Sequence, residues 1–406
     1  MLAFQMFGIP RAQCFRILRL EEDSADAAHS SQGTRIIASP RIGTSGVRDR
    51  LFSLLLFDVL NLAAPRGIKQ TTMVKARAIF VCILTWMVFT ACARCAAQSS
   101  TSATLQTAPE KVIIDTDIGD DIDDAFAVAL ALRSPELQIL GITTTFGDTE
   151  MRAKLLDRLL GEVGRADIPV AAGPPTPPKT AFTQLRYAEG GHFAKTLHPD
   201  AVTFLLEEIR RNPGEITLVA IGPLVNVGSA IEKDRDTFRK LKRVVLMGGS
   251  IYRGYGDVGN GPPHGPQPEW NILNDIPSAQ KLFAAGVPLF VMPLDSTQLK
   301  MDAANRNFLF RQGTPITDAL TLLYHQWAQE TPTLFDPMTI AFIVKPELCP
   351  VEPMRIHIDE KGYTRPVEPP KLANSQGAPY VPNAQVCLKS NPDDFFHFLV
   401  PRLAAP

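Results

Sequence analysis

The chain has 406 residues, of which 45% are hydrophobic and 20% are charged, and its formal net charge at pH 7 is -1. These values indicate a globular protein with one large domain or two small ones. With a net charge near zero, the chain lacks the overall positive charge that is typical of proteins binding nucleic acid or an acidic lipid surface. The six cysteines show neither a zinc-site spacing nor the density of a disulfide-rich framework.

The first hundred residues have the pattern of export rather than of a domain. Residues 1–72 mix Arg-rich and Ser-rich pieces with a short apolar run and show no sustained period. Residues 73–97 begin with the positive stretch Met73–Arg77, continue with a sixteen-residue apolar core and end in small residues. That sequence of regions is typical of a secretory signal peptide, and its core is short for a membrane span.

We therefore expect translation to begin at Met73 and cleavage to follow Ala97, so that residues 1–72 are a start-site artefact. The mature protein would be periplasmic or secreted, without stable insertion in a membrane. An uncleaved anchor and a lipidated Cys92 are the alternatives. Intact-mass measurement of the natural protein decides between them.

Residues 98–110 form a polar linker, and from residue 111 to residue 406 strand-like and helix-like segments alternate. We expect strands at Lys111–Ile114, Leu137–Thr145, Ile168–Ala172, Ile216–Ile221, Val244–Met247 and Val287–Met292. We expect helices at Asp124–Leu132, Thr149–Val163, Asp200–Arg211, Ser278–Ala285 and Asp393–Leu403, and another that begins at Leu224–Ile231. This βαβ series predicts an α/β fold with an open, mostly parallel Rossmann-like sheet and helices on both faces. Small peripheral strands are expected near the C-terminus, at Met354–Asp359, Gly362–Pro366 and Ala384–Leu388.

Carboxylates are concentrated between the first predicted strand and the first predicted helix. Six lie within ten residues: Asp115, Asp117, Asp120, Asp121, Asp123 and Asp124. Carboxylates a few ångströms apart disfavour one another's ionisation, and a bound divalent cation is the simplest remedy. Oxygen donors favour Ca²⁺ or Mg²⁺ over zinc. A solvated acidic loop with a helix-capping Asp is the alternative, but the position at the carboxyl end of a buried strand favours a site.

Other predicted strands are also followed by polar loops. These contain Asp148, the turn Ile221–Asn226, the pair Gly248 and Gly249, the run Glu269-Trp270-Asn271 and, much later, Asp336. Taken singly, each has a local explanation as a helix cap, a turn former or a helix start. Because the carboxyl ends of parallel strands meet at one edge of a sheet, together they favour a shared site.

These motifs resemble the nucleoside hydrolases of the inosine–uridine-preferring type over residues 111–406. The resemblance rests on Asp115-Thr-Asp117-Ile-Gly119 with Asp123-Asp124-Ala125, Gly141-Ile-Thr-Thr144, Ile221–Asn226, Val245–Gly249, Glu269-Trp-Asn271 and Phe335-Asp336. It implies an open α/β fold, one tightly held Ca²⁺ ion, and hydrolysis of the N-glycosidic bond of ribonucleosides to ribose and free base. It also implies a homo-oligomer, either a dimer or a tetramer.

The resemblance implies roles for individual residues. Asp117 would bind the metal and act as the base on the attacking water. The remaining metal ligands would be Asp124, Asp336 and the backbone carbonyl of Ile221, where the family usually has Thr. The sugar would be bound by Asp123, Asp148, Glu269 and Asn271.

Three departures from the family pattern affect these roles. The acidic loop is two residues longer, so the ligand register within Asp120–Asp124 stays open and Asp121 is a further candidate ligand. Asp148 replaces an Asn, and Phe335 replaces the His that protonates the leaving base in purine-using members. Loops elsewhere offer other acids, although a surface or packing role is favoured for each of them: His192, His264 and Tyr187.

Two other functions fit parts of the pattern. A protein that captures a ribosyl compound without cleaving it is favoured by the missing His and opposed by the candidate base Asp117. A haloacid-dehalogenase-like phosphatase is suggested by Asp115-Thr-Asp117 after a strand, but that motif has Thr or Val where this chain has Gly119. Export would permit a disulfide between Cys349 and Cys387, whose distance in the fold the sequence leaves open.

Overall fold

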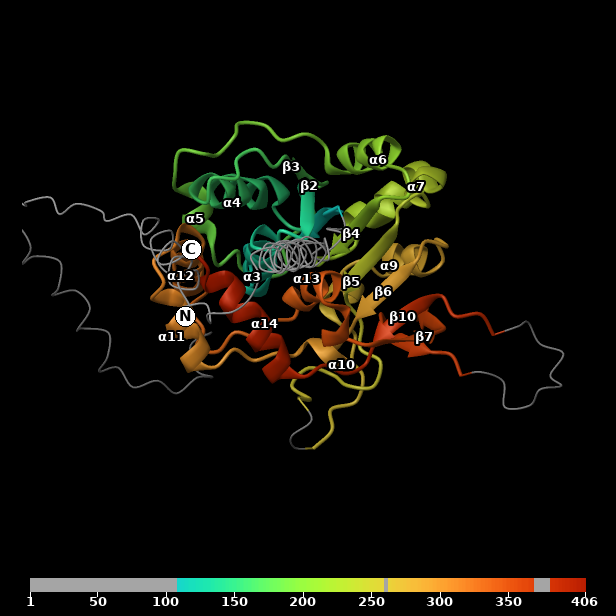
Figure 1. Ribbon diagram of the computed structural model, residues 1–406. Coiled ribbons are helices and arrows are strands. Elements are labelled where there is room, and N and C mark those ends of the chain that lie inside the picture. Colours follow the sequence, from blue (N-terminus) through green and yellow to red (C-terminus); the bar gives the residue numbers. More distant parts are fainter. Residues whose placement is uncertain (1–107, 259–261, 369–379) are drawn as a thin grey trace, which may run out of the picture. The chain divides into compact units, whose positions relative to one another are not determined.

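The computed structural model describes residues 108–258, 262–368 and 380–406 (Figure 1). The upstream segment 1–72, the signal peptide 73–97 and most of the linker 98–110 lie outside the described residues, so the predictions made for them stay predictions. Among the described residues, we find no helix with the length and hydropathy of a membrane span.

An eight-stranded sheet lies at the centre of the described chain, in the order β3-β2-β1-β4-β5-β6-β10-β7. Its strands are β1 (Glu110–Thr116), β2 (Leu137–Thr144), β3 (Val170–Ala172), β4 (Ile216–Ala220), β5 (Arg243–Met247), β6 (Leu289–Met292), β7 (Val351–Met354) and β10 (Ala384–Cys387). Every neighbouring pair is parallel except β10 and β7. The α/β fold class predicted from the sequence is therefore confirmed. The strand order changes direction at β1: β2 and β3 are added on one side of it, and β4, β5 and β6 on the other. Open α/β sheets bind ligands at such a switch point, which here lies between β1 and β4.

The C-terminal strands are only partly separate from this sheet. β8 (Ile356–Ile358) and β9 (Thr364–Pro366) pair with each other in a small second sheet. β10 instead extends the main sheet beside β6, where Val386 and Cys387 are fully buried. Cys349 and Cys387 form a disulfide with a Cα–Cα distance of 5.6 Å, which answers the question that the sequence left open.

Helices cover both faces of the sheet (Figure 1). On one face the core includes α3 (Asp123–Leu132), α4 (Thr149–Glu162), α12 (Pro315–Trp327), α13 (Pro337–Val344) and α14 (Pro392–Ala404). On the other it includes α6 (Ala201–Arg211), α7 (Val225–Phe238) and α9 (Ile276–Phe283). Shorter helices are α5 (Leu185–Glu189), α8 (Trp270–Leu273), α10 (Leu294–Thr297), α11 (Ala303–Phe310) and the 3-10 helix Pro346–Leu348. The alternation along β1 explains this layering, since Val112 and Ile114 enter the first core and Ile113 the second.

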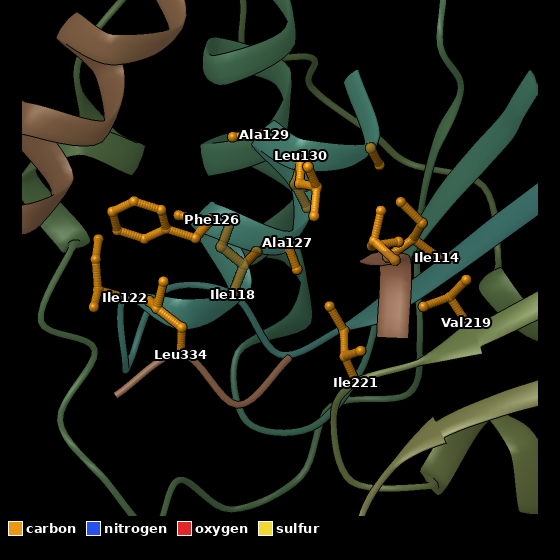
Figure 2. Packing of buried hydrophobic residues seen from close by; sticks show 14 of the residues in the cluster. Ile114, Ile118, Ile122, Phe126, Ala127, Ala129, Leu130, Val219, Ile221 and Leu334 are labelled. Atoms are coloured by element: carbon orange, nitrogen blue, oxygen red, sulfur yellow. The ribbon is translucent and has the colours of Figure 1, made fainter. Parts of the chain in front are cut away.

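The predicted elements are present, with most ends shifted by one or two residues, and α7 continues to Phe238. The acidic loop between β1 and α3 is fixed to the core by two isoleucines. Ile118 and Ile122 are fully buried in one cluster with Phe126 of α3 and Leu334 (Figure 2). Burial of such a side chain contributes about 2 kcal/mol. The loop therefore buries its apolar residues, whereas aspartates of the same loop line a cavity.

Candidate active site

The carboxyl ends of three neighbouring strands open on a cavity of about 430 Å³. Asp117 follows β1, Ile221 follows β4 and Met247 ends β5, and all three line it. The other acidic and polar lining residues include Asp120, Asp121, Asp123, Asp124, Glu269, Asn271 and Asp336. Aromatic side chains form another part of the wall: Tyr255, Trp270, Trp327 and Phe335. The cavity thus combines a carboxylate-rich part with an aromatic part.

A cluster of three buried carboxylates can hold a metal ion. Oxygen atoms of Asp123, Asp124 and Asp336 lie within 4.8 Å of one another. The first two begin α3 and the third precedes α13, and these helices pack against each other. Thr116 donates a hydrogen bond to Asp124 from the end of β1. Helix packing therefore brings together residues from distant parts of the chain.

The three carboxyls of this cluster are buried close together, which disfavours their ionised forms unless a cation is bound. Burial, with added repulsion from neighbouring carboxylates, raises the pKa of all three carboxyls. Burial also raises the pKa of Asp117 to about 7, against the opposing charge of Arg152, and that of Glu269 to about 7. A positive ion would let these groups ionise at neutral pH. The donors are all oxygen, so the site fits a hard divalent cation.

Arg152 of α4, which the sequence analysis did not identify, holds the acidic loop in place. Its side chain is 2% exposed, and it donates to the backbone carbonyls of Asp117 and Ile118, the second at 2.9 Å. It also forms a bidentate ion pair with Asp120, at 3.1 and 2.9 Å. The sequence did contain a signal for this role, since the helical period places Arg152 on the apolar face of α4. The other residues of that buried face are Leu155, Leu156, Leu159 and Leu160.

The structure places each aspartate of the loop in a different environment. Asp120 is bound by Arg152 and by the Thr180 hydroxyl. Asp121 lines the cavity, but its carboxylate accepts the N–H of Ile122 at 2.6 Å, and it is not part of the three-carboxylate cluster. Asp117 lines the cavity beside that cluster without belonging to it. The acidic loop is two residues longer than in the family pattern. With this longer loop, Asp123 and Asp124 are the aspartates that lie beside Asp336.

The predicted sugar-binding pair Glu269 and Asn271 does lie in the cavity. The Glu269 carboxylate caps α8 and accepts backbone N–H groups of Gly249 at 2.9 Å, Asn271 at 3.0 Å and Ile272 at 3.2 Å. The Asn271 amide donates to the Met247 carbonyl at 3.1 Å. Both side chains are therefore held rigidly by backbone groups at the ends of β5 and α8.

Four other candidates lie away from the cavity. Asp148 is exposed and caps α4, where it accepts the N–H of Met151 at 3.0 Å. Its carboxylate is therefore engaged in starting a helix, and the structure does not bring it to the sugar-binding residues. His192 and His264 are exposed, and the buried Tyr187 donates to Glu162. None of the four lines the cavity, whereas Tyr255, which the sequence analysis did not single out, does.

Comparison with known proteins gives one family. Residues 112–397 match the family model described as inosine-uridine preferring nucleoside hydrolase. The chain is 32% identical over 321 residues to a pyrimidine-specific ribonucleoside hydrolase, RihA, of Citrobacter koseri, a match that covers 72% of this chain and 97% of that protein. It is 30% identical over 275 residues to uridine nucleosidase 1 of Arabidopsis thaliana, covering 62% of this chain and 79% of that protein.

Solved structures agree with this result. The plant nucleoside hydrolase PpNRh1 superposes with a TM-score of 0.61 at 27% identity, over 73% of this chain and all of that one. A purine-preferring ribonucleoside hydrolase of Gardnerella vaginalis, at 22% identity and a TM-score of 0.59 over 73% of this chain and 98% of that one, shares the fold. The chain therefore belongs to the inosine–uridine preferring nucleoside hydrolase family, hydrolases that cleave the N-glycosyl bond of ribonucleosides.

Proposed function

We propose that this protein is a calcium-dependent ribonucleoside hydrolase in which Asp117 is the catalytic base. The observation that carries the proposal is the buried three-carboxylate cluster of Asp123, Asp124 and Asp336 in one cavity with Asp117. Repulsion among three buried carboxylates destabilises their ionised forms unless a cation is bound. The cavity gives a nucleoside access to these residues.

The metal would be held by Asp117, Asp124, Asp336 and the backbone carbonyl of Ile221. Calcium accepts six to eight oxygen ligands in a flexible geometry, which suits a mixture of carboxylates and a carbonyl. When bound, it would supply positive charge at the cluster and make a bound water more acidic. The position of Asp123 in the same cluster allows it to bind either the ion or a ribose hydroxyl.

The chain's own residues account for the remaining requirements of the reaction. Glu269 and Asn271, held by backbone groups, would orient the sugar hydroxyls. Asp117 would take a proton from the attacking water. As the bond to the base breaks, positive charge grows on the ribosyl group, and the surrounding carboxylates would stabilise it.

Pyrimidine ribonucleosides are the substrates that we propose. Two relatives carry names that specify uridine or pyrimidine ribonucleosides. Phe335 lines the cavity where the resemblance places the His of purine-using members, and Phe cannot protonate a purine. The aromatic wall of Tyr255, Trp270 and Phe335 offers flat apolar surface for a base.

We also propose export and self-association for the mature protein. Export is supported by the signal-peptide pattern at 73–97 and by the disulfide of Cys349 with Cys387, because disulfides persist in oxidising compartments. A homo-oligomer is what the family resemblance implies. N-terminal sequencing of the natural protein and light scattering of the purified protein test these two points, and a retained segment 73–97 or a monomer would contradict them.

A reducing-sugar assay tests the activity. The purified protein is given a panel of pyrimidine and purine ribonucleosides, after chelation and again after addition of Ca²⁺ or Zn²⁺. We expect ribose release from uridine that is abolished by the chelator and restored by calcium in preference to zinc. Tight nucleoside binding without ribose release would instead support a non-catalytic binding protein on this fold.

A further inference from the structure

Tyr255 reaches the cavity from the long segment between β5 and α8. Its ring packs edge-on against Phe335, with centroids 6.2 Å apart and an interplanar angle of 79°. Its hydroxyl oxygen accepts a hydrogen bond from the backbone N–H of Trp270 at 2.9 Å. Trp270 lies between Glu269 and Asn271, the proposed sugar-binding pair. Both the ring and the hydroxyl are thus fixed at the boundary between the polar and the aromatic parts of the cavity.

The hydroxyl proton of Tyr255 is available to a ligand. The bond with Trp270 uses the oxygen as an acceptor, so the O–H can still donate. Within the described residues, no acceptor for this proton is found. Partial burial and the charge of Glu269 raise the pKa of the phenol, so it keeps its proton at neutral pH. Because Tyr255 lines the cavity and is 36% exposed, a molecule bound there can accept this proton in place of solvent water.

The reaction needs a donor on the side of the leaving base. When the glycosidic bond breaks, its electron pair passes to the base nitrogen, and in a pyrimidine the charge is shared with the neighbouring carbonyl oxygen. Phe335, which forms that wall together with Tyr255, has no donor. A neutral hydroxyl aimed at the developing charge lowers the barrier without having to transfer its proton completely.

We propose that Tyr255 is the catalytic residue that donates a hydrogen bond to the departing base. The assignment rests on the proposed function, since it concerns the same site. Water adds to the anomeric carbon while Asp117 accepts one of its protons, and the C–N bond breaks with its electron pair going to the base. The base is held by the Tyr255 O–H and takes a proton from solvent, to which Asp117 releases its own. The products are ribose and the neutral base.

The test compares two leaving groups in the variant Tyr255→Phe, which keeps the ring against Phe335 and removes only the hydroxyl. One substrate is uridine, and the other is 4-nitrophenyl ribofuranoside, whose nitrophenolate departs without help from a donor. We expect kcat/KM for uridine to fall roughly 100-fold, the usual effect of removing one such donor. For the nitrophenyl riboside we expect no appreciable loss. The matched control is Tyr252→Phe, an exposed tyrosine of the same segment that does not line the cavity, for which both rates should be unchanged.

Two results with the Tyr255→Phe variant would overturn the assignment while leaving the proposed function intact. An equal loss on both substrates would show that Tyr255 acts only through the position of Trp270, and unchanged rates on both would show that it does not act at all. The unfolding midpoints of the variants report separately on folding. A wild-type protein that releases ribose from neither substrate, with calcium present, would overturn the proposed function and the Tyr255 assignment with it.

Discussion

Arg152 and Asp120 form an ion pair at the acidic loop, 2.9 Å from Nη2 to Oδ2, with side chains 2% and 17% exposed. The same guanidinium binds the carbonyls of Asp117 and Ile118. One residue of α4 therefore neutralises one aspartate of the loop and fixes the backbone that carries the proposed base. Asp120 has a structural role, whereas Asp123 and Asp124 are left to the carboxylate cluster.

Arg152→Met should destabilise the protein strongly. Arg152 is buried and Asp120 is 17% exposed, so losing the guanidinium leaves a largely buried charge without compensation, at a cost of up to roughly 3–5 kcal/mol. Arg165→Met is the matched control, because Arg165 pairs with Asp167 at the exposed surface and such pairs contribute about 1 kcal/mol or less. Urea denaturation measures both changes, and equal losses in the two variants would refute the structural role of Arg152.

Asp117→Asn should lower turnover of a ribonucleoside by at least about 100-fold, as expected for loss of a general base, with the fold retained. Asp148→Asn is the control with the same chemical change. Asp148 is an exposed N-cap outside the cavity, and Asn caps helices as well as Asp does. Steady-state kinetics with added calcium distinguish the two sites. Comparable losses in both variants would contradict the placement of Asp148 outside the site.

The metal-free protein should become less stable as the pH rises from about 4 to about 7. Burial raises the folded-state pKa of Asp115 to about 6, and of Asp117 and Glu269 to about 7, from ordinary values of 3.8 for Asp and 4.5 for Glu. In that range the folded state binds more protons than the unfolded state, so the free energy of unfolding falls with rising pH. The stabilisation that these groups contribute is complete below their unfolded-state pKa. It is lost as the pH rises through their folded-state pKa.

Calcium should weaken or reverse this dependence, because it binds the ionised carboxylates of the folded protein. Thermal unfolding at several pH values, with chelator and with calcium, measures both effects. A metal-free protein whose stability rises steadily between pH 4 and pH 7 would show that other carboxylates dominate.

Loss of the disulfide should destabilise the protein without changing the site. Cys349 and Cys387 are both buried and lie 38 residues apart. Replacing both by Ala should lower the free energy of unfolding by about 2–4 kcal/mol, with kcat retained because neither residue lines the cavity. A reductant should destabilise the wild type and have no effect on the double variant. An equal effect of the reductant on both proteins would assign the loss to another cause.

Local sequence patterns determined the alternation of strands and helices. The run Val112–Ile114 predicts a strand buried on both faces, and the apolar stretch after Asp124 predicts a buried helix, because periodicity and burial depend on neighbouring residues. The predicted parallel sheet is confirmed, as is the carboxylate-rich loop at the end of its first strand. The helices α5, α8, α10, α11 and α12 were not predicted.

The family resemblance already groups Asp124 with Asp336, but the physical contact between such distant residues comes only from the tertiary structure. Asp336 joins Asp123 and Asp124 because α13 packs on α3, and no local pattern encodes that contact. Arg152 binds Asp120, Asp148 stays at its helix cap, and Tyr255 enters the cavity from a long loop. In each case the role is set by the distance between segments far apart in the chain, and that distance is fixed by core packing rather than by the residue's sequence neighbours.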